Sequence, residues 1–362
     1  MEDKIIMGGI TFDDALLLPG YTDFKRQEVT IATTLHPTIT LKLPVISSPM
    51  DTVTEGAMAE ALAKAGGLGI IHRNLSVGDQ ASMVDQVKKK NLLIGAAVGA
   101  GSDLEERVKA LVAAKADVIV VDSGHGYTKF VVDAVKFIKT NYPKQVVMAG
   151  NVATADGAKA LIDAGSDIIR VGMGPGSICT TRIITGMGVP QLTAISEVGK
   201  ATRGTKVTIV ADGGIKQIGD MAKALGMGAH AVMLGSLLAG FDESPGEKVE
   251  KDGKAYKRYR GMGSVGAMKE GSAERYGQSK DADKRTLIAE GVEGLVPYKG
   301  DVSAYLEQVT GSLRSSFYYI GAKTMDEFHK KARFIRITPA SMRESHPHSI
   351  LVSDAGGNYT LS

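Results

Sequence analysis

Short apolar runs alternate with amphipathic stretches along the first two thirds of the chain. Each run is followed by glycine or polar residues and then by a segment with the helical period, such as 55–65 and 103–114. Short apolar runs bounded by turn residues are typical of buried strands, and their alternation with helices is typical of parallel sheets. The strand candidates are residues 44–47, 68–72, 92–98, 117–121, 145–149, 167–171, 207–211 and 230–234. Eight strand–helix units in series predict an α/β protein with a (β/α)8 TIM barrel, in preference to an open doubly wound sheet.

The two ends of the chain depart from this rhythm. An alternating segment at 29–40 predicts a lead-in with a short hairpin. Residues 242–300 are rich in charge and glycine, which predicts a solvated lid or a disordered insertion, with a mobile flap at about 265–295. Helices are expected again at 302–319 and 324–333, before a polar tail. We therefore expect residues 1–362 to form a single catalytic domain.

Composition restricts the classes of function. The chain has 43% hydrophobic and 23% charged residues, as soluble globular proteins do. A net charge of +3 with only 5% aromatic residues and no tryptophan argues against a nucleic-acid partner. One cysteine excludes an internal disulfide framework and suits a reducing compartment. Without an apolar leader or a long apolar span, we expect a cytoplasmic protein without a membrane partner.

In a barrel of this kind, the residues directly after each strand form the catalytic face. Here these positions are small, polar or glycine-bearing, and several could hold a phosphate through backbone N–H groups. The phosphate candidates are Gly214, Gly235 and Ser236 after the last two strands, with Ser177 nearby. Glycines that only turn the chain are the alternative, but their gathering on one rim favours a phosphate ligand.

The only cysteine, Cys179, lies in a glycine-rich segment, 172–188, that follows the strand candidate at 167–171. A lone cysteine is more often inert, and a packing cysteine is usually surrounded by apolar side chains. This position after a strand, between glycines and beside two hydroxyls, favours a nucleophile instead. A second candidate, the pair His346 and His348, lacks a third metal ligand nearby and is better interpreted as part of a surface tail.

Several separated motifs resemble one family. They are Ser-Ile-Cys-Thr-Thr at 177–181, Tyr-Arg-Gly-Met-Gly-Ser at 259–264, Arg-Tyr at 275–276, Glu-Gly-Val-Glu-Gly at 290–294 and Arg-Glu-Ser-His-Pro-His at 343–348. Together they resemble the inosine 5′-monophosphate dehydrogenase family along nearly the whole chain. The resemblance implies a homotetrameric (β/α)8 barrel that oxidises IMP to XMP with NAD in guanine nucleotide biosynthesis. It also implies a monovalent cation, usually K+, at the cysteine loop.

The resemblance assigns roles residue by residue. It implies that Cys179 attacks C2 of the purine to form a covalent thioimidate, which Arg275 hydrolyses through water with help from Tyr276 and Thr181. The implied substrate-binding residues are Ser48, Met50, Ser177, Asp212, Gly214, Gly235, Ser236, Tyr259, Gly261, Met262, Gly263 and Glu290. The implied NAD-binding residues are Asp122, Ser123, His125, Asn151, Arg170 and Gly172. Carbonyls of Gly174, Gly176 and Cys179 are implied as K+ ligands, completed by residues 354–357 of a neighbouring subunit.

Three features depart from the family pattern. Most members carry a pair of regulatory CBS modules between the second helix and the third strand, whereas residues 85–94 run straight through, so the module is absent near 88–92. Gly277 stands where an aromatic residue is expected, and 279–289 is longer than usual. These last two departures bear on closure of the flap.

Two other functions remain as alternatives. GMP reductase shares the barrel and the Cys-Thr-Thr loop and deaminates GMP to IMP with NADPH, but that family lacks the Arg-Tyr pair and the His-Pro-His tail. A non-catalytic nucleotide-binding barrel would use the phosphate rim alone, and Cys179, Thr181 and Arg275 argue against it.

Overall fold

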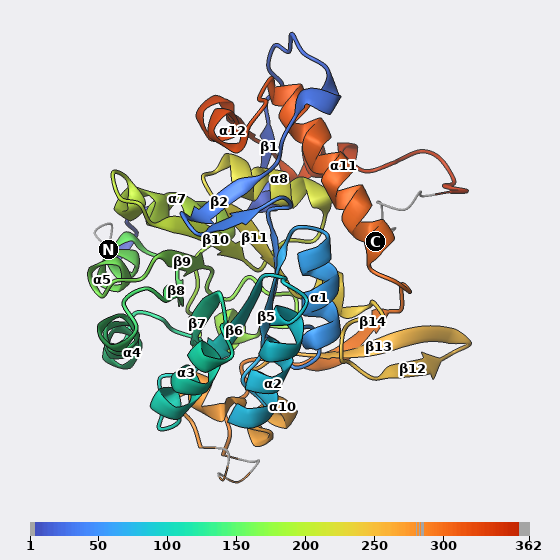
Figure 1. The fold of residues 1–362 in the computed structure, drawn as a ribbon. Helices are drawn as coiled ribbons and strands as arrows, with labels where there is room; N and C mark the ends of the chain where they lie inside the picture. The colour runs from blue at the N-terminus through green and yellow to red at the C-terminus, as the bar shows by residue number, and fades with distance from the viewer. Residues whose placement is uncertain (1–3, 280, 282, 284–285, 355–362) are drawn as a thin grey trace.

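Eight parallel strands close into a barrel at the centre of the molecule (Figure 1). The structure is a computed structural model and describes residues 4–279, 281, 283 and 286–354. In hydrogen-bonded order the strands are β10 (Thr208–Asp212), β11 (Ala231–Leu234), β4 (Val45–Ser47), β5 (Leu68–Ile71), β6 (Ile94–Val98), β7 (Val118–Asp122), β8 (Val146–Val152) and β9 (Ile168–Val171). The predicted TIM barrel and all eight of its strand positions are confirmed.

The barrel strands are apolar on both faces because both faces are buried. Ile46 and Val118 point into the barrel interior, whereas Val45 and Ile119, one residue along, pack against the surrounding helices. Each fully buried side chain of this size contributes about 1.5–3 kcal/mol relative to an exposed one. Since the strands are buried on both faces, they are mostly apolar, and the charged and amide exceptions Asp122, Asn151, Arg170 and Asp212 lie towards their carboxyl ends.

The predicted hairpin closes one end of the barrel. It consists of β2 (Thr33–His36) and β3 (Ile39–Leu41), with alternate side chains buried. The buried side chains of Leu35 and Ile39 join the cluster of the barrel interior. Thr208 Oγ1 at the start of β10 donates a hydrogen bond to the Leu35 carbonyl at 2.8 Å. The hairpin therefore covers the amino-terminal ends of the strands and leaves their carboxyl ends for a site.

Helices surround the barrel. Several begin at a serine or threonine whose hydroxyl accepts the N–H three residues on, as Ser76, Thr128 and Thr154 do. The helix α11 follows the polar segment 242–300 and packs against α8. The helices are α1 (Gly56–Lys64), α2 (Val77–Lys88), α3 (Leu104–Ala113), α4 (Lys129–Asn141), α5 (Ala155–Asp163), α6 (Thr181–Thr185), α7 (Gln191–Thr202), α8 (Ile218–Gly226), α9 (Ser236–Ala239), α10 (Val265–Lys269), α11 (Ser303–Ile320), α12 (Met325–Lys331) and α13 (Pro339–Glu344). Within the described residues, none of these helices is long and apolar enough to cross a membrane.

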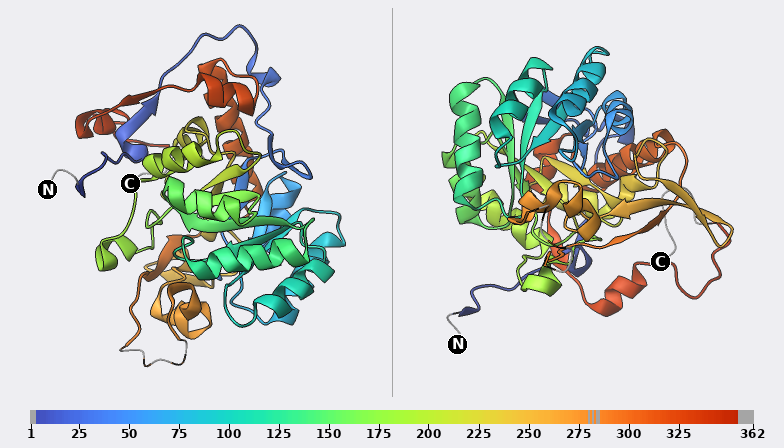
Figure 2. Two further views of the ribbon diagram at one scale, coloured as in Figure 1. Left: turned by 90° about the vertical axis from the view of Figure 1, so that its left-hand side faces the viewer. Right: turned by 90° about the horizontal axis from the view of Figure 1, so that it is seen from below.

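Segment 242–300 is not the solvated loop that its composition predicts. It contains a three-stranded antiparallel sheet of β12 (Lys248–Lys251), β13 (Lys254–Arg260) and β14 (Glu293–Pro297), with α10 and the 3-10 helix η4 (Ser272–Tyr276) between the last two strands. Figure 2 shows this sheet extending away from the barrel. The expectation is wrong because the ladder satisfies the backbone and because Lys257 is buried, its ammonium donating to the carbonyls of Phe241 and Ser244. A hydropathy scale predicts that such a lysine is exposed, although Lys257 is buried.

Two terminal strands and one short turn complete the chain. The strands β1 (Ala15–Leu17) and β15 (Phe334–Arg336) pair in an antiparallel two-stranded sheet. Between α2 and β6 the chain passes through a short turn at Asn91, which has φ of 57°. The connection at 88–92 is thus a simple turn. Of the flap region, residues 280, 282 and 284–285 lie outside the described residues, as do 355–357 of the tail.

A half-buried histidine pair next to the barrel predicts a loss of stability in acid. The rings of His230 and His329 lie 5.2 Å apart, and His230 Nδ1 accepts a hydrogen bond from the Ile209 N–H at 3.2 Å. Burial and then the neighbouring His329 lower the pKa of His230 from 6.5 to about 4, and Asp326 opposes this shift. The unfolded chain takes up this proton below its ordinary pKa, so stability falls as the pH drops from about 6.5 towards 4.

We expect this group to lower the free energy of unfolding by about 2 kcal/mol between about pH 7 and about pH 5. Urea denaturation at both pH values measures it. His230→Asn should reduce this pH dependence by about that amount, whereas His348→Asn, at an exposed tail position, should leave it unchanged. Equal pH dependence in His230→Asn and the unmodified chain would contradict the assignment.

Candidate active site

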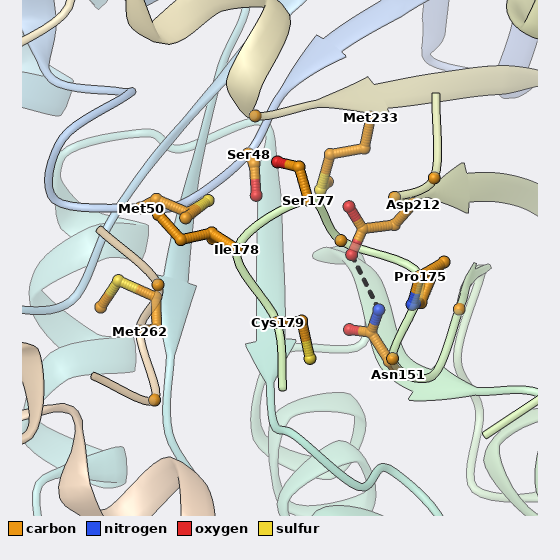
Figure 3. A pocket seen from close by; sticks show the side chains of 18 of the residues that line it. Ser48, Met50, Asn151, Pro175, Ser177, Ile178, Cys179, Asp212, Met233 and Met262 are labelled. Atoms are coloured by element: carbon orange, nitrogen blue, oxygen red, sulfur yellow. Dashed lines mark hydrogen bonds between the residues drawn. The ribbon is translucent and has the colours of Figure 1, made fainter. Parts of the chain in front are cut away.

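A pocket opens at the carboxyl ends of the barrel strands, where the predicted site residues gather (Figure 3). Segments at or after the carboxyl ends of β4, β7, β8, β9, β10 and β11 line it, together with residues 259, 261–263, 275–276 and 290 from beyond the barrel. The lining includes Ser48, Met50, Asn151, Arg170, Gly172, Gly174, Gly176, Ser177, Cys179, Thr181, Asp212, Gly214, Gly235, Ser236, Tyr259, Gly261, Met262, Gly263, Arg275, Tyr276 and Glu290. Every residue predicted to be catalytic, substrate-binding or cation-ligating is therefore at one site.

Three predicted NAD-binding residues do not line this pocket. Asp122 ends β7 and is buried with 3% of its surface exposed. Ser123 and His125 form a turn of their own, in which the Ser123 hydroxyl donates to the His125 carbonyl at 3.1 Å. Several other residues line the pocket that were not predicted to, including Lys216 and Met233. Met233 is near the end of β11, where the strand position alone could have indicated it.

The cysteine loop is held from both sides. At its base, the Arg182 guanidinium donates to the carbonyls of Met173 at 3.2 Å and Val189 at 2.6 Å. Gly172 has φ of 149°, and a Cβ there would overlap the Asp212 carbonyl oxygen, so only glycine fits. At its tip, the Thr180 N–H donates to the Glu290 carbonyl at 2.9 Å. The loop is thus fixed between the barrel and the returning flap strand.

Cys179 faces the middle of the pocket. Its thiol donates to Thr181 Oγ1 at 3.1 Å. In Figure 3, Met50 and Met262 lie on one side of the sulfur and Asp212 and Asn151 on the other. The thiol is therefore placed between an apolar wall that suits a flat ring and a polar wall that suits hydroxyls.

A network of buried charges runs beneath the pocket. Arg170, with 2% of its surface exposed, pairs with Asp122 through Nη1 and with Asp212 through Nη2, the latter at 2.9 Å. Asn151 Nδ2 also donates to Asp212 Oδ2, at 2.8 Å. All of these contacts with Asp212 use Oδ2, which leaves Oδ1 to accept hydrogen bonds from a ligand. The arginine predicted to meet NAD therefore holds two carboxylates in place.

The flap brings a second arginine to the same network. Arg275 pairs with Asp122, and its carbonyl accepts the Gly124 N–H at 3.2 Å. Burial and then the nearby Arg73 guanidinium lower the pKa of Arg275, while Tyr276 and the contact with Asp122 oppose this. Burial also raises the pKa of Tyr276. An arginine in a dry site beside another cation can yield a proton more readily than one in water.

Gly277 has a conformational reason for replacing an aromatic residue. It ends η4 with φ of 67°, in the left-handed region. A residue with a Cβ reaches this region at a cost of about 1–2 kcal/mol. The glycine therefore shapes the turn that presents Arg275 and Tyr276 to the pocket.

Burial also sets the ionisation of Tyr259, opposite the flap. Only 6% of this residue is exposed, and burial raises its pKa to about 12. Its hydroxyl therefore stays protonated and can donate to a bound ligand at neutral pH. Among the described residues, no cluster of histidine, cysteine and carboxylate side chains could hold a metal ion, and His346 and His348 lie in the exposed tail.

Comparison with known proteins assigns the chain to a family. The family model of the IMP dehydrogenase / GMP reductase domain matches residues 9–348. The chain belongs to this family. The resemblance inferred from the separated motifs is thus confirmed.

The curated relatives cover the chain almost completely. Proteins named inosine-5′-monophosphate dehydrogenase from Halalkalibacterium halodurans and Aquifex aeolicus are 37% and 39% identical over 486 aligned positions, covering 99% of this chain and 100% and 99% of theirs. The protein of that name from Cryptosporidium parvum is 41% identical over 403 positions, covering 99% of this chain and 100% of its own. Since this chain has 362 residues, the first two family members carry long insertions relative to it and the third a much shorter one.

Removal of Arg170 is expected to destabilise the whole barrel. Arg170→Met leaves Asp122 and Asp212 without the cation between them, and breaking a buried pair costs about 3–5 kcal/mol. Lys159→Met is the control, because Lys159 and Asp163 form a pair with 68% and 59% of the side chains exposed. Its loss should stay below about 1 kcal/mol. Urea denaturation compares the two, and equally small losses would contradict the structural role.

Proposed function

We propose that this chain oxidises IMP to XMP with NAD and so serves guanine nucleotide biosynthesis. The observation that carries the proposal is the placement of Cys179, the only thiol, in a pocket that also receives Arg275 and Tyr276 from the flap. The family membership and the names of the relatives agree with this activity.

The first half of the reaction uses the thiol. C2 of the purine lies between two ring nitrogens and is therefore electrophilic. When the Cys179 sulfur adds to C2, the C2–N3 double bond opens, N3 takes the thiol proton and C2 becomes tetrahedral. The C2 hydrogen would then leave with its electron pair as hydride, for which bound NAD is the acceptor, and the C=N bond is restored. Thr181 Oγ1, 3.1 Å from the sulfur, accepts the thiol hydrogen bond and orients the attack. The product of this half is a thioimidate on Cys179.

Substrate binding follows from the two walls of the pocket. Asp212 offers Oδ1 to the ribose hydroxyls, and Gly214, Gly235 and Ser236 offer backbone N–H groups to the phosphate. The protonated Tyr259 hydroxyl adds a donor. Met50 and Met262 contact the base, since thioethers adapt to flat apolar surfaces.

The second half of the reaction is hydrolysis. Water adds to C2, the bond from C2 to the Cys179 sulfur breaks, and the thiol is regenerated as XMP forms. Arg275 takes the proton from the water only in its neutral form, which burial favours by lowering its pKa and which the ion pair with Asp122 opposes, and Tyr276 lies next to it. The ion pair with Asp122 holds the Arg275 guanidinium over the pocket.

The residues present fit the cofactor and the cation. Asn151 Oδ1 is buried and has no hydrogen-bond partner among the described residues, so it could accept one from bound NAD, which supplies the hydride acceptor. In the described part of the chain, the carbonyls of Gly174 and Cys179 accept no backbone hydrogen bond. Together with Gly176 they would hold K+, an ion that backbone carbonyls bind well. Arg182 fixes the loop that carries them.

Two features of the family remain proposals for this chain. We infer that the insertion of the longer relatives corresponds to the CBS modules, because α2 leads to β6 here through a short turn. We also infer a homotetramer from the family resemblance.

GMP reductase is the second candidate function, since the family model covers both activities, and the Arg275–Tyr276 pair favours the dehydrogenase. Assays with IMP and NAD, and with GMP and NADPH, discriminate between them.

The covalent mechanism predicts a sharp separation of binding from turnover. Cys179→Ala should bind IMP about as tightly as the unmodified chain, because the removed atom contributes little to the walls of the pocket. It should form no NADH, since no other thiol exists in the chain. Calorimetric titration and absorbance at the NADH band measure the two properties. Appreciable turnover by this variant would refute the covalent mechanism.

A role for Arg275 in hydrolysis alone predicts a burst. Arg275→Ala should release about one equivalent of NADH per site and then turn over about 10²–10⁴-fold more slowly, as for loss of a general base. The adduct on Cys179 should accumulate and be visible by intact mass. Glu274→Gln is the matched control on the same 3-10 helix, because Glu274 is half exposed and lies 3.9 Å from Arg73. A variant at Arg275 without the burst would assign the residue to binding or hydride transfer instead.

A further inference from the structure

Asp51 and Arg260 lie just outside the pocket, each next to a residue that lines it. Asp51 directly follows Met50, and Arg260 lies between Tyr259 and Gly261. The two segments come from distant parts of the sequence, the loop after β4 and the end of β13. They meet at the pocket wall, where Tyr259 Oη lies 3.8 Å from Met50 Sδ. Whatever joins Asp51 to Arg260 therefore sets the distance between two parts of one wall.

Asp51 and Arg260 form a bidentate ion pair, and further hydrogen bonds lie next to it. Arg260 Nε donates to Asp51 Oδ1 at 3.1 Å, and Nη2 donates to Oδ2 at 2.8 Å. The Arg260 backbone N–H donates to Thr52 Oγ1 at 3.2 Å. Asn74 Nδ2, from the loop after β5, donates to Asp51 Oδ2 at 2.9 Å. The contact thus fixes both direction and register, which a single hydrogen bond would not.

Burial makes this contact sensitive to the shape of its cation. Only 7% of the Asp51 side chain and 19% of the Arg260 side chain are exposed. The hydrogen bonds that Arg260 donates to Asp51 raise the pKa of Arg260, so the guanidinium stays charged. A guanidinium presents two parallel N–H donors to a carboxylate, whereas a lysine ammonium is a point charge on a flexible stem. Lysine here would keep the charge and lose the geometry.

The same arginine extends the join to the flap. Arg260 Nη2 also pairs with Glu270, at the end of α10, which leads into η4 and Arg275. A buried ion pair adds little to global stability, because desolvation offsets the attraction, and its best-supported use is to specify one arrangement. This favours a function in geometry over a function in folding.

We propose that Arg260, held by Asp51, is a positioning residue that sets the width of the purine-binding wall for the oxidation of IMP. It acts through Tyr259, Met262 and Met50 and does not touch the reacting atoms. The proposal rests on the function proposed above. It predicts that the pair governs the affinity for the purine nucleotide more than the affinity for NAD, since the residues assigned to NAD follow other strands.

The test compares Arg260→Lys with Arg258→Lys. Arg258 is two residues earlier on β13 and pairs with Glu247 at 2.6 Å, with 63% and 66% of the two side chains exposed. Arg260→Lys should raise KM for IMP by about tenfold, a typical effect of weakening a charge-assisted contact, and change KM for NAD less than about threefold. Arg258→Lys should leave both values unchanged. Thermal unfolding of each variant monitors the folded fraction.

A double-mutant cycle with Asp51→Asn adds a second measurement. If the two residues act through one contact, Arg260→Lys combined with Asp51→Asn should have about the KM for IMP of the weaker-binding single variant. Multiplying effects would show that the residues act separately and would overturn the proposal.

The remaining outcomes are distinct. Equal kinetics of Arg260→Lys and Arg258→Lys would overturn the inference while leaving the proposed function intact. A fall in kcat that matches the loss of folded protein, with KM for IMP unchanged, would assign Arg260 a purely structural role and also overturn it. Failure of the unmodified chain to form NADH from IMP and NAD would refute the proposed function itself.

Discussion

Closure of the barrel is the constraint on which the rest of the molecule depends. Eight parallel strands satisfy one another's backbone groups only if the sheet closes, and parallel strands all end on the same face. With the hairpin of Leu35 and Ile39 over the opposite end, the carboxyl ends are left as the place where a pocket can form. Residues as distant in sequence as Ser48, Asp212 and Ser236 meet there because each lies at or just after the carboxyl end of a strand.

Beneath that pocket, the buried charges must compensate one another. Burial of Asp122 next to Asp212 is costly unless a cation pairs with these carboxylates. Arg170 supplies it, and Arg275 of the flap joins the same carboxylate, Asp122. The segment that carries Arg275 and the barrel strand β7 are thereby linked through one side chain, Asp122.

The segment after β11 shows how polar sequence can still form ordered structure. Its strands bury few apolar side chains, but the antiparallel ladder pairs the backbone from Tyr256 to Arg260 with β14. Lys257 lies with its stem buried and its ammonium at backbone carbonyls, and Arg260 attaches the end of β13 to the loop after β4. Directional polar contacts thus do here what apolar burial does in the barrel. They also bring residues 290–292 alongside the cysteine loop, which completes the pocket.

The barrel strands could be predicted from sequence because burial on both faces imposes continuous apolar runs, and the cysteine loop because glycines and a lone thiol stand out directly after one. Motif resemblance supplied the flap residues Arg275 and Tyr276, which the alternation of apolar and polar positions does not reveal. The pairing of β13 with β14 was missed because these partners are distant in sequence, whereas β12 and β13 form a local hairpin across Asp252 and Gly253. Partners distant in sequence also join Arg170 to two carboxylates, and Asp51 to Arg260, and sequence alone predicted neither contact. By itself the sequence determined which residues are apolar, nucleophilic or charged, since these are properties of single side chains. Only the tertiary structure decided which charges face one another, because the partner of a buried ion is set by proximity after folding.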